Sequence, residues 1–274
     1  MKIDSFNTTD VDTGECKHPF NNPELYNLIA VPQYFFAQET IKEMEINPTD
    51  RILDIGCGDG KITLDLAKMA SSGRVVGTDL SEDMIGFAKK TYLSPDRNNL
   101  EFMTMDAEKN AFTNQFDMVI SFFCLQWVRN QLAVLKGIKN ALVPGGRMVL
   151  TLPLVSEAEK LMGVIASGEK WGQYFTDFEN PRVDFVPEVY ARLLEEAGFE
   201  KRVLKEKVLP YEFDSQRDAE LFLKACMPHV KKLPESKQDE FLADIASTWL
   251  RTGGSENKLD FSLTMLVVSA VKPS

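Results

Sequence analysis

Three glycines, Gly56, Gly58 and Gly60, stand at alternate positions directly after the apolar run 51–55 in "RILDIGCGDG". Glycine permits a tight turn and lets main chain approach a ligand with no Cβ in the way. Loops that hold the pyrophosphate of a dinucleotide run G-x-G-x-x-G, whereas the third glycine here comes one residue early. Asp59 within the loop would also repel a phosphate. The pattern therefore favours a ligand that carries a positive charge and no phosphate.

Two further carboxylates follow the next two apolar runs. Asp79 ends "RVVGTD", at a position where a carboxylate can accept hydrogen bonds from both hydroxyls of a ribose. Asp106 follows "FMTM", where it can accept a hydrogen bond from an exocyclic amine such as that of adenine. A single aspartate at a strand end is as readily a loop cap or a solvated turn. The glycine loop and both aspartates, in this order and spacing, favour a binding site at one edge of a sheet.

These residues are embedded in an alternation of strands and helices. Apolar runs predict strands at 51–57, 74–80, 99–107, 116–124, 147–153, 201–213 and 259–271. Helical spacing and caps predict helices at 60–70, 81–92, 129–142 and 187–199, the third of them stopped by "VPGG". Strands separated by helices of this length imply parallel pairing through right-handed crossovers.

The remaining segments suggest how a site could be covered. Residues 1–21 are polar enough to form a loose tail, and residues 22–274 are expected to form a single domain. The stretch from Pro23 to Met44 is expected to be helical, with an interruption at Pro32. Helical insertions near 155–186 and 215–254 are expected to form a lid over the substrate, since insertions beyond the carboxyl edge of a sheet commonly do so.

Composition excludes several classes of function. The chain has 274 residues, 44% of them apolar, and a formal net charge of -10, which argues against binding nucleic acid. Its four cysteines form no CxxC pair, so no metal site or disulfide framework is expected and a reducing cytoplasm fits best. No run of about 18 apolar residues suggests a membrane span. The sequence assigns no oligomeric state.

At this point the motifs resemble a known family. In order, "ILDIGCGDG", "VVGTDLS", "FMTMDAE", "FDMVISFFCLQWV" and "LVPGGRMVL" resemble the motifs of class I methyltransferases that use S-adenosylmethionine and release S-adenosylhomocysteine. Outside these motifs, "LYNLIAVPQ", "SFFCLQWVRNQ" and "MPHVKKLPESKQDEFLADI" are similar to the juvenile hormone acid and trans-aconitate methyltransferases. The resemblance implies an α/β, doubly wound, Rossmann-like sheet of seven mostly parallel strands, with an antiparallel last strand and a helical lid.

The resemblance also implies roles for individual residues along the cofactor. Asp54 would hold the loop, or the cofactor ammonium through water. The other implied contacts are Gly56, Gly58 and the main chain around Cys57 along the methionine part, Gly60 in the same loop, Asp79 at the ribose, Leu80 and Met84 on either face of adenine, Asp106 and Ala107 at its edge, Ser121 and Phe122 at the ammonium, and Tyr26 and Gln33 closing over the methyl donor.

Gln126 and Trp127 are the predicted catalytic residues, because they follow the fourth strand and would donate hydrogen bonds to an anionic oxygen beside the reactive methyl group. The two histidines, His18 and His229, are both expected at the surface, so a general base is scarce. A carboxylate needs no base because it arrives ionised. The sequence therefore favours O-methylation of a small carboxylic acid by direct in-line transfer.

Other interpretations remain open at this stage. The acceptor could be another small molecule methylated on oxygen or nitrogen, or the chain could be a partner protein that binds the cofactor without turnover. A dinucleotide oxidoreductase is disfavoured by Asp59 and by the position of Gly60. Several cations in the inserted segments could attract an acidic substrate, and the sequence does not select among Lys170, Arg182, Lys224, Lys231 and Lys232.

Overall fold

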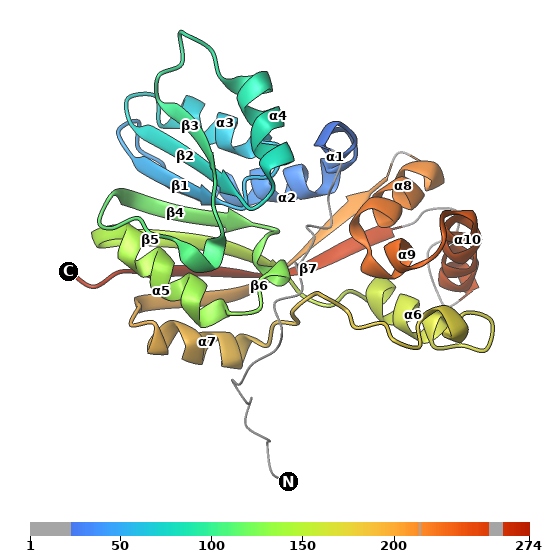
Figure 1. Cartoon of the computed structure of the whole chain (residues 1–274). Helices are drawn as coiled ribbons and strands as arrows, with labels where there is room; N and C mark the ends of the chain where they lie inside the picture. The colour runs from blue at the N-terminus through green and yellow to red at the C-terminus, as the bar shows by residue number, and fades with distance from the viewer. Residues whose placement is uncertain (1–22, 214, 252–259) are drawn as a thin grey trace.

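The computed structural model describes residues 23–213, 215–251 and 260–274. Within these ranges the chain forms a seven-stranded sheet in the order β3-β2-β1-β4-β5-β7-β6 (Figure 1). The strands are β1 (Arg51–Ile55), β2 (Arg74–Asp79), β3 (Leu100–Thr104), β4 (Phe116–Phe122), β5 (Leu142–Pro153), β6 (Glu200–Glu212) and β7 (Asp260–Val271). Strands β1 to β5 pair in parallel, and β7 runs antiparallel to both of its neighbours. The predicted fold class is confirmed, whereas the predicted tail 1–21 lies outside the described residues.

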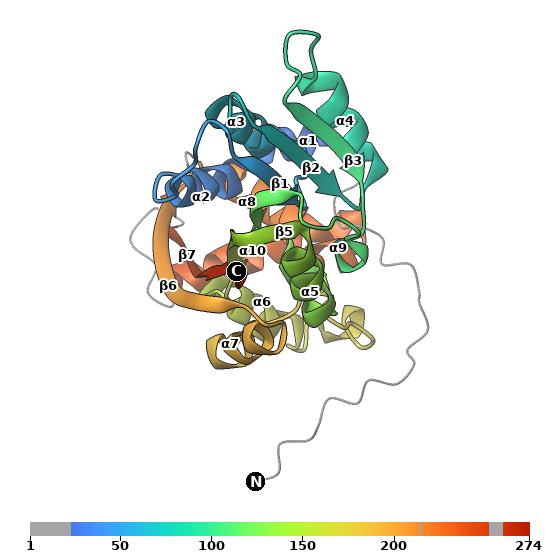
Figure 2. The ribbon, with the colours of Figure 1, turned by 90° about the vertical axis from the view of Figure 1, so that its left-hand side faces the viewer.

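Helices cover both faces of the sheet. The described helices are α1 (Pro23–Ile29), α2 (Val31–Ile41), α3 (Lys61–Met69), α4 (Glu82–Tyr92), α5 (Gln131–Ala141), α6 (Glu157–Ala166), α7 (Pro187–Glu196), α8 (Gln216–Cys226), α9 (Pro228–Lys232) and α10 (Glu235–Arg251), with single 3-10 turns η1 (Ala107–Lys109), η2 (Leu125–Trp127) and η3 (Gly172–Tyr174). Helices α2, α3 and α4 lie on one face of the sheet, and α5 and α7 lie on the other (Figure 2). Their apolar side chains pack into the cores on the two faces. Strands β2 and β3 lie on one side of β1, and β4 and β5 lie on the other, so the strand order reverses between β1 and β4. In such sheets ligands bind at the reversal, beyond the carboxyl ends of the strands.

Local signals explain where most helices begin, and two segments differ from expectation by more than a few residues at their ends. The side chain of Ser81, the first residue of the predicted helix 81–92, accepts a 3.3 Å hydrogen bond from the amide of Met84 and caps α4. The predicted helix 23–44 is two helices, α1 and α2, because Pro32 stands in the first turn of α2 and has no N–H to continue the preceding helix. "VPGG" does not form a separate loop after α5, since β5 already begins at Leu142 and accommodates Gly145 at φ +76°.

The two predicted insertions carry α6, α8, α9 and α10, which gather at the carboxyl end of the parallel strands (Figure 1). They share an apolar core with α2 and β7, made by Phe36, Met162, Trp171, Phe222, Val230, Phe241 and Met265. The indole Nε1 of Trp171 donates a 2.8 Å hydrogen bond to Asp244, which ties the first insertion to α10. This helical group therefore forms one packed unit over the sheet edge.

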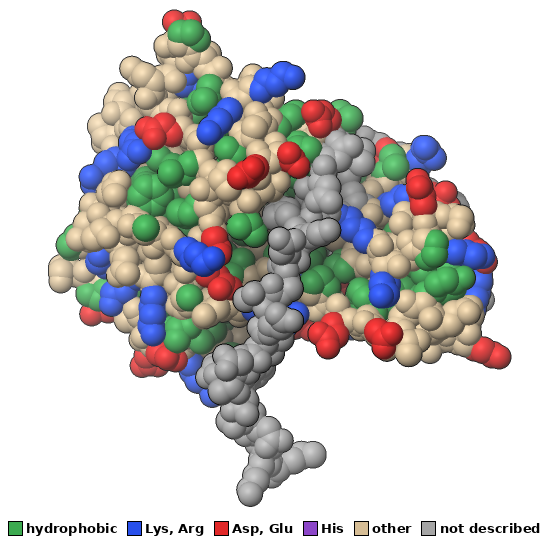
Figure 3. All heavy atoms as spheres, viewed as in Figure 1, with side chains coloured by type: hydrophobic (Ala, Val, Ile, Leu, Met, Phe, Trp, Pro, Cys, Tyr) green, Lys and Arg blue, Asp and Glu red, His purple; other side chains and the backbone are tan. Residues whose placement is uncertain are grey.

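The surface is mixed in charge. On the face shown in Figure 3, acidic and basic side chains are interspersed with small apolar areas. None of the helices in the described ranges is both long enough and apolar enough to cross a lipid bilayer.

Candidate functional site

The glycine loop turns sharply between β1 and α3. Gly56, Gly58 and Gly60 have φ of +75°, +53° and +84°, a region that favours glycine. The amide of Gly56 donates a 2.7 Å hydrogen bond to the carbonyl of Thr78 on β2. A Cβ on Gly56 would lie 2.2 Å from Sγ of Cys124, so the loop packs closely against the segment that follows β4. The tight turn predicted from the glycine spacing is present, and it is fixed from both neighbouring strands.

A pocket opens where β1, β2, β3 and β4 end. We call it the strand-end pocket, and it encloses about 770 Å³ of space, part of it open to solvent. Of the predicted cofactor residues it brings together Tyr26, Gly56, Gly58, Asp79, Leu80, Met84, Asp106, Ala107 and Phe122. Sequence reasoning did not assign its other lining residues to the cofactor: Ile55, Met105, Phe123, Cys124, Trp127 and Val128. Most of the predicted cofactor contacts thus share one cavity.

Both strand-end aspartates are held by main-chain amides. Asp79 is buried, and its two carboxylate oxygens accept hydrogen bonds from the amides of Gly58, at 3.0 Å, and Ser81, at 2.9 Å. Asp106 accepts a 2.9 Å hydrogen bond from the amide of Glu108 and so caps η1. Each carboxylate keeps further lone pairs on its oxygens, so capping does not prevent it from accepting hydrogen bonds from a ligand.

Other predicted cofactor residues support the loop rather than line the strand-end pocket. Asp54 is buried and accepts a 2.6 Å hydrogen bond from the hydroxyl of Thr63 on α3, and burial raises the pKa of its carboxyl to about 7. Ser121 donates a 2.7 Å hydrogen bond to the carbonyl of Ile55. Cys57 and Gly60 also lie outside this lining, and Gly60 stands at the start of α3. Of the two roles given to Asp54, the geometry favours holding the loop.

Asp59 has a different role from the one inferred from its charge. Its carboxylate does not line the strand-end pocket; it accepts a 2.7 Å hydrogen bond from the side-chain amide of Asn27 on α1 and a 3.1 Å bond from the amide of Lys61. The carboxylate therefore links α1 to the glycine loop.

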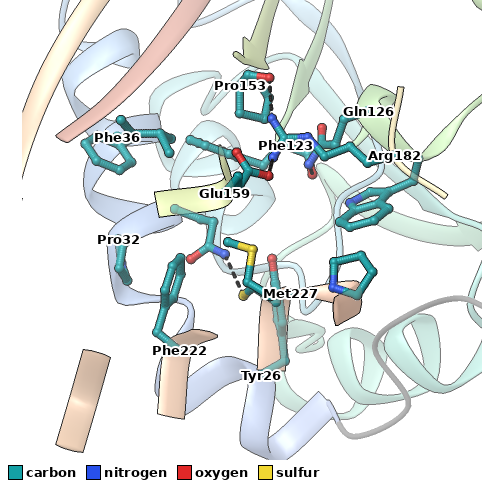
Figure 4. A pocket seen from close by; sticks show the side chains of 15 residues that line it. Tyr26, Pro32, Phe36, Phe123, Gln126, Pro153, Glu159, Arg182, Phe222 and Met227 are labelled. Carbon is teal, nitrogen blue, oxygen red and sulfur yellow. Dashed lines mark hydrogen bonds and ion pairs between the residues drawn. The ribbon is translucent and has the colours of Figure 1, made fainter. Parts of the chain in front are cut away.

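A second pocket lies beside the insertion helices α6, α8 and α9, and we call it the lid pocket (Figure 4). It encloses about 600 Å³, part of it open, and is lined by Tyr26, Pro32, Gln33, Phe36, Phe123, Gln126, Trp127, Pro153, Glu159, Arg182, Phe222, Cys226, Met227, Pro228 and Leu263. Tyr26, Phe123 and Trp127 line both pockets, so the two cavities adjoin at these residues. Gln33, predicted as a cofactor residue, is placed in the lid pocket instead.

Gln126 and Trp127, the predicted catalytic residues, differ in the pockets that they line. Gln126 lines the lid pocket, and its Nε2 donates a 2.8 Å hydrogen bond to the carbonyl of Phe123, a residue held at φ +54°. Trp127 lies at the junction of the two pockets, because η2 turns the chain back after β4. Of these two side chains, only Trp127 lies where ligands bound in either pocket could contact it.

The cysteine and tyrosine groups around the pockets stay protonated at neutral pH. Burial raises the pKa of the Cys226 thiol to about 11, and it also raises the pKa of the Cys57 and Cys124 thiols. The hydroxyl of Tyr26 has its pKa raised well above its usual value, chiefly by burial. His229 packs against the Phe178 ring, 4.7 Å between centroids, and lines neither pocket. The thiols of Cys124 and Cys226 and the hydroxyl of Tyr26 are therefore poor general bases at neutral pH.

Comparison with known proteins decides the family. Residues 52–146 match the family described as a methyltransferase domain. An uncharacterized methyltransferase of Schizosaccharomyces pombe is 31% identical over 186 residues, which cover 63% of this chain and 67% of the yeast protein. The chain belongs to the methyltransferase family. This chain is also 28% identical over 205 residues to the juvenile hormone acid O-methyltransferase of Drosophila melanogaster, and the match covers 71% of this chain and 69% of the insect protein.

Among solved structures, the methyltransferase shares its fold with phosphoethanolamine N-methyltransferase 2 of Haemonchus contortus, determined with S-adenosyl-L-methionine. The TM-score is 0.62 at 19% identity, over 98% of this chain and 62% of that chain. The sequence and fold comparisons agree with the expectation drawn from the motifs.

Proposed function

We propose that this methyltransferase O-methylates the carboxylate of a small organic acid by direct in-line transfer from S-adenosylmethionine. The observation that carries the proposal is the adjoining of two cavities, one at the strand ends and one under the lid, at Tyr26, Phe123 and Trp127. In-line transfer requires the two reactants to be aligned and shielded from water, which a shared wall between two pockets favours.

The residues of the strand-end pocket fit S-adenosylmethionine. Asp79 and Asp106 are its charged lining residues, and none of the described lining residues is a lysine or arginine, so the pocket suits a cation. Gly58 lines it with bare main chain, and a Cβ there would come within 3.5 Å of the Tyr26 ring. S-adenosylmethionine supplies, when bound, an electrophilic methyl group on a positively charged sulfur.

In this proposal the residues of the chain bind S-adenosylmethionine and orient the acceptor. Asp79 accepts hydrogen bonds from the ribose, while Leu80 and Met84 contact adenine. Asp106 and the amide of Ala107 bind the adenine edge. The main chain of the glycine loop holds the methionine part, and Trp127 orients the acceptor oxygen at the junction of the pockets.

The acceptor class follows from the protonation states around the pockets. An alcohol or amine acceptor has to lose a proton, which needs a base of suitable pKa. Burial raises the pKa of Tyr26 and Cys226, and His229 lines neither pocket, so these groups are poor candidates for that base. Glu159 lies in the lid pocket but is paired with Arg182. A carboxylate acceptor, already ionised at neutral pH, avoids the requirement.

The proposal is tested by incubating the protein with tritium-labelled S-adenosylmethionine and a panel of mono-, di- and tricarboxylic acids. We expect label in a methyl ester, which mild alkali hydrolyses to volatile labelled methanol. Label that resists alkali, obtained with amines or phenols in place of acids, would support the second candidate, methylation of another small oxygen or nitrogen acceptor. Tight binding of S-adenosylhomocysteine with no transfer to any class would indicate a binding protein without turnover.

A further inference from the structure

A buried ion pair lies in the lid pocket. The side chains of Arg182 and Glu159 are 8% and 11% exposed, and Nη1 of Arg182 donates to Oε1 of Glu159 (Figure 4). Nη2 of Arg182 donates a 2.6 Å hydrogen bond to the carbonyl of Pro153 at the end of β5. The other oxygen of Glu159 accepts a 2.9 Å hydrogen bond from the amide of Ser156, in the capping box of α6. The guanidinium is therefore fixed between a strand end and a helix start.

Arg182 and the segment that contacts it each have a buried polar atom without a hydrogen-bond partner. The two atoms are Nε of Arg182, a donor, and Oε1 of Gln126, an acceptor. Both residues line the lid pocket, and the amide of Val183 donates a 2.8 Å hydrogen bond to the carbonyl of Gln126, so the two segments are in direct contact. Buried polar groups are nearly always paired in folded proteins. Gln33 adds a further unpaired acceptor, Oε1, to the lining of the same pocket. The unpaired donor of Arg182 and the unpaired acceptor of Gln126 lie on segments that contact each other, and together they match a ligand group that both accepts and donates.

The charge balance of the pocket selects among such groups. Arg182 and Glu159 are the charged side chains among the described lining residues, and together they are neutral. A second carboxylate on the acceptor would be buried with no uncompensated cation to receive it, which is costly. A hydroxyl or a carboxamide carries both a donor and an acceptor and no charge.

We infer that the acceptor carries, besides the carboxylate to be methylated, a neutral hydroxyl or carboxamide group that binds between Nε of Arg182 and Oε1 of Gln126. The inference rests on the proposed function, since it describes the far end of the same substrate. Arg182 and Gln126 are then specificity-determining residues, and Glu159 is a positioning residue that holds Arg182 and neutralises its charge.

The first test compares acids matched in length. Straight-chain monocarboxylic acids, their counterparts with a hydroxyl at successive positions, and the corresponding dicarboxylic acids are measured for kcat/KM, and for binding to protein saturated with S-adenosylhomocysteine. We expect one hydroxylated isomer to be preferred over the unsubstituted and dicarboxylic acids by about tenfold or more. Equal or better use of the unsubstituted or dicarboxylic acid would overturn the inference while leaving carboxylate methylation intact. If no acid binds or reacts while S-adenosylhomocysteine binds, the proposed function fails and the inference fails with it.

The second test changes the charge balance. Glu159→Gln keeps an oxygen that can accept from Ser156 in the capping box, but it leaves Arg182 with an uncompensated charge. We expect its preference to move toward the dicarboxylic acid by about tenfold relative to the unaltered protein. Arg182→Lys keeps the positive charge and removes the Nε donor, so the preference for the hydroxylated acid should disappear.

The control is Arg192→Gln, a change of an exposed arginine on α7 that should leave the substrate preference unaltered. Melting temperature and affinity for S-adenosylhomocysteine show whether each variant is folded, and the ratio of kcat/KM values between acids is the readout that a purely structural role would not move. An unaltered ratio in both Glu159→Gln and Arg182→Lys would overturn the inference.

Discussion

The side-chain amide of Asn27 donates a 2.7 Å hydrogen bond to the carboxylate of Asp59 and joins α1 directly to the glycine loop. Asp59 is buried, and burial raises the pKa of its carboxyl above the usual value. The residue before Asn27, Tyr26, lines both pockets. The Asn27–Asp59 contact therefore holds α1, which carries Tyr26, against the loop at the edge of the strand-end pocket.

Replacing Asn27 with alanine should loosen α1 and weaken the binding of S-adenosylhomocysteine. The lost hydrogen bond to a carboxylate corresponds to about 1.5 kcal/mol, or about tenfold in affinity. Isothermal titration measures the effect. Leu28→Ala on the same helix is the control, because Leu28 is 72% exposed. An Asn27→Ala variant that binds as tightly as the control would contradict a closing role for α1.

Gly56→Ala should cost more stability than Gly145→Ala, although both glycines have nearly the same positive φ, +75° and +76°. The backbone strain is shared and amounts to about 1 to 2 kcal/mol. Only at Gly56 would the new Cβ meet another atom, Sγ of Cys124 at 2.2 Å, whereas nothing lies within 4 Å at Gly145. The clash should add about 1 to 3 kcal/mol. Urea unfolding of both variants gives the difference, and equal losses would show that the loop has room to move.

Much of the fold follows from local signals in the sequence. The apolar runs and glycine turns predict the strands, and Ser81 marks the start of α4 by capping it. The break between α1 and α2 was only partly foreseen, since Pro32 removes an N–H but does not by itself say where the first helix ends. The entry of "VPGG" into β5 was missed because pairing with neighbouring strands outweighs local turn chemistry there.

The sequence predicted less of the candidate site than of the fold. Strand-end residues such as Asp79 have positions fixed by topology, so their spacing predicts them. Asp59 was assigned by its charge, but its side chain turns to Asn27, a partner 32 residues away in sequence. The sequence could not separate Arg182 from the four lysines of the inserted segments, because its burial depends on Glu159 and Pro153, 23 and 29 residues distant. Such tertiary partners leave no periodic pattern in the sequence.

The carboxyl of Asp54 should make stability depend on pH. Burial raises its pKa to about 7 in the folded chain, against about 3.9 in an unfolded one. The folded state thus binds the proton more tightly, so the stabilisation is complete below about pH 4 and is lost as pH rises through about 7. The loss is on the order of 4 kcal/mol. We expect the free energy of unfolding, measured with urea between about pH 5 and pH 8, to fall less steeply with pH in Asp54→Asn than in the unaltered protein. The side-chain oxygen of the asparagine can still accept the hydrogen bond from Thr63. Identical slopes would place the carboxyl in its ionised form throughout.

Trp127→Phe should separate binding from turnover. The variant keeps an aromatic wall between the two pockets and removes the indole N–H. We expect affinity for S-adenosylhomocysteine to stay within about twofold while kcat falls by about tenfold or more, the effect of losing one hydrogen bond to a charged group. A variant with the kcat of the unaltered protein would remove the indole N–H from the reaction.

Calorimetric titration with S-adenosylhomocysteine of the unaltered protein, Asp79→Ala and Asp96→Ala tests the central claim most directly. The carboxylate of Asp79 is held by the amides of Gly58 and Ser81 at the strand end, whereas Asp96 is exposed on the loop after α4 and serves as the control. We predict binding by the unaltered protein and Asp96→Ala, and a loss of about 1.5 to 3 kcal/mol in Asp79→Ala. No binding at millimolar ligand, or equal affinity in all three proteins, would contradict the assignment of the strand-end pocket to the methyl donor.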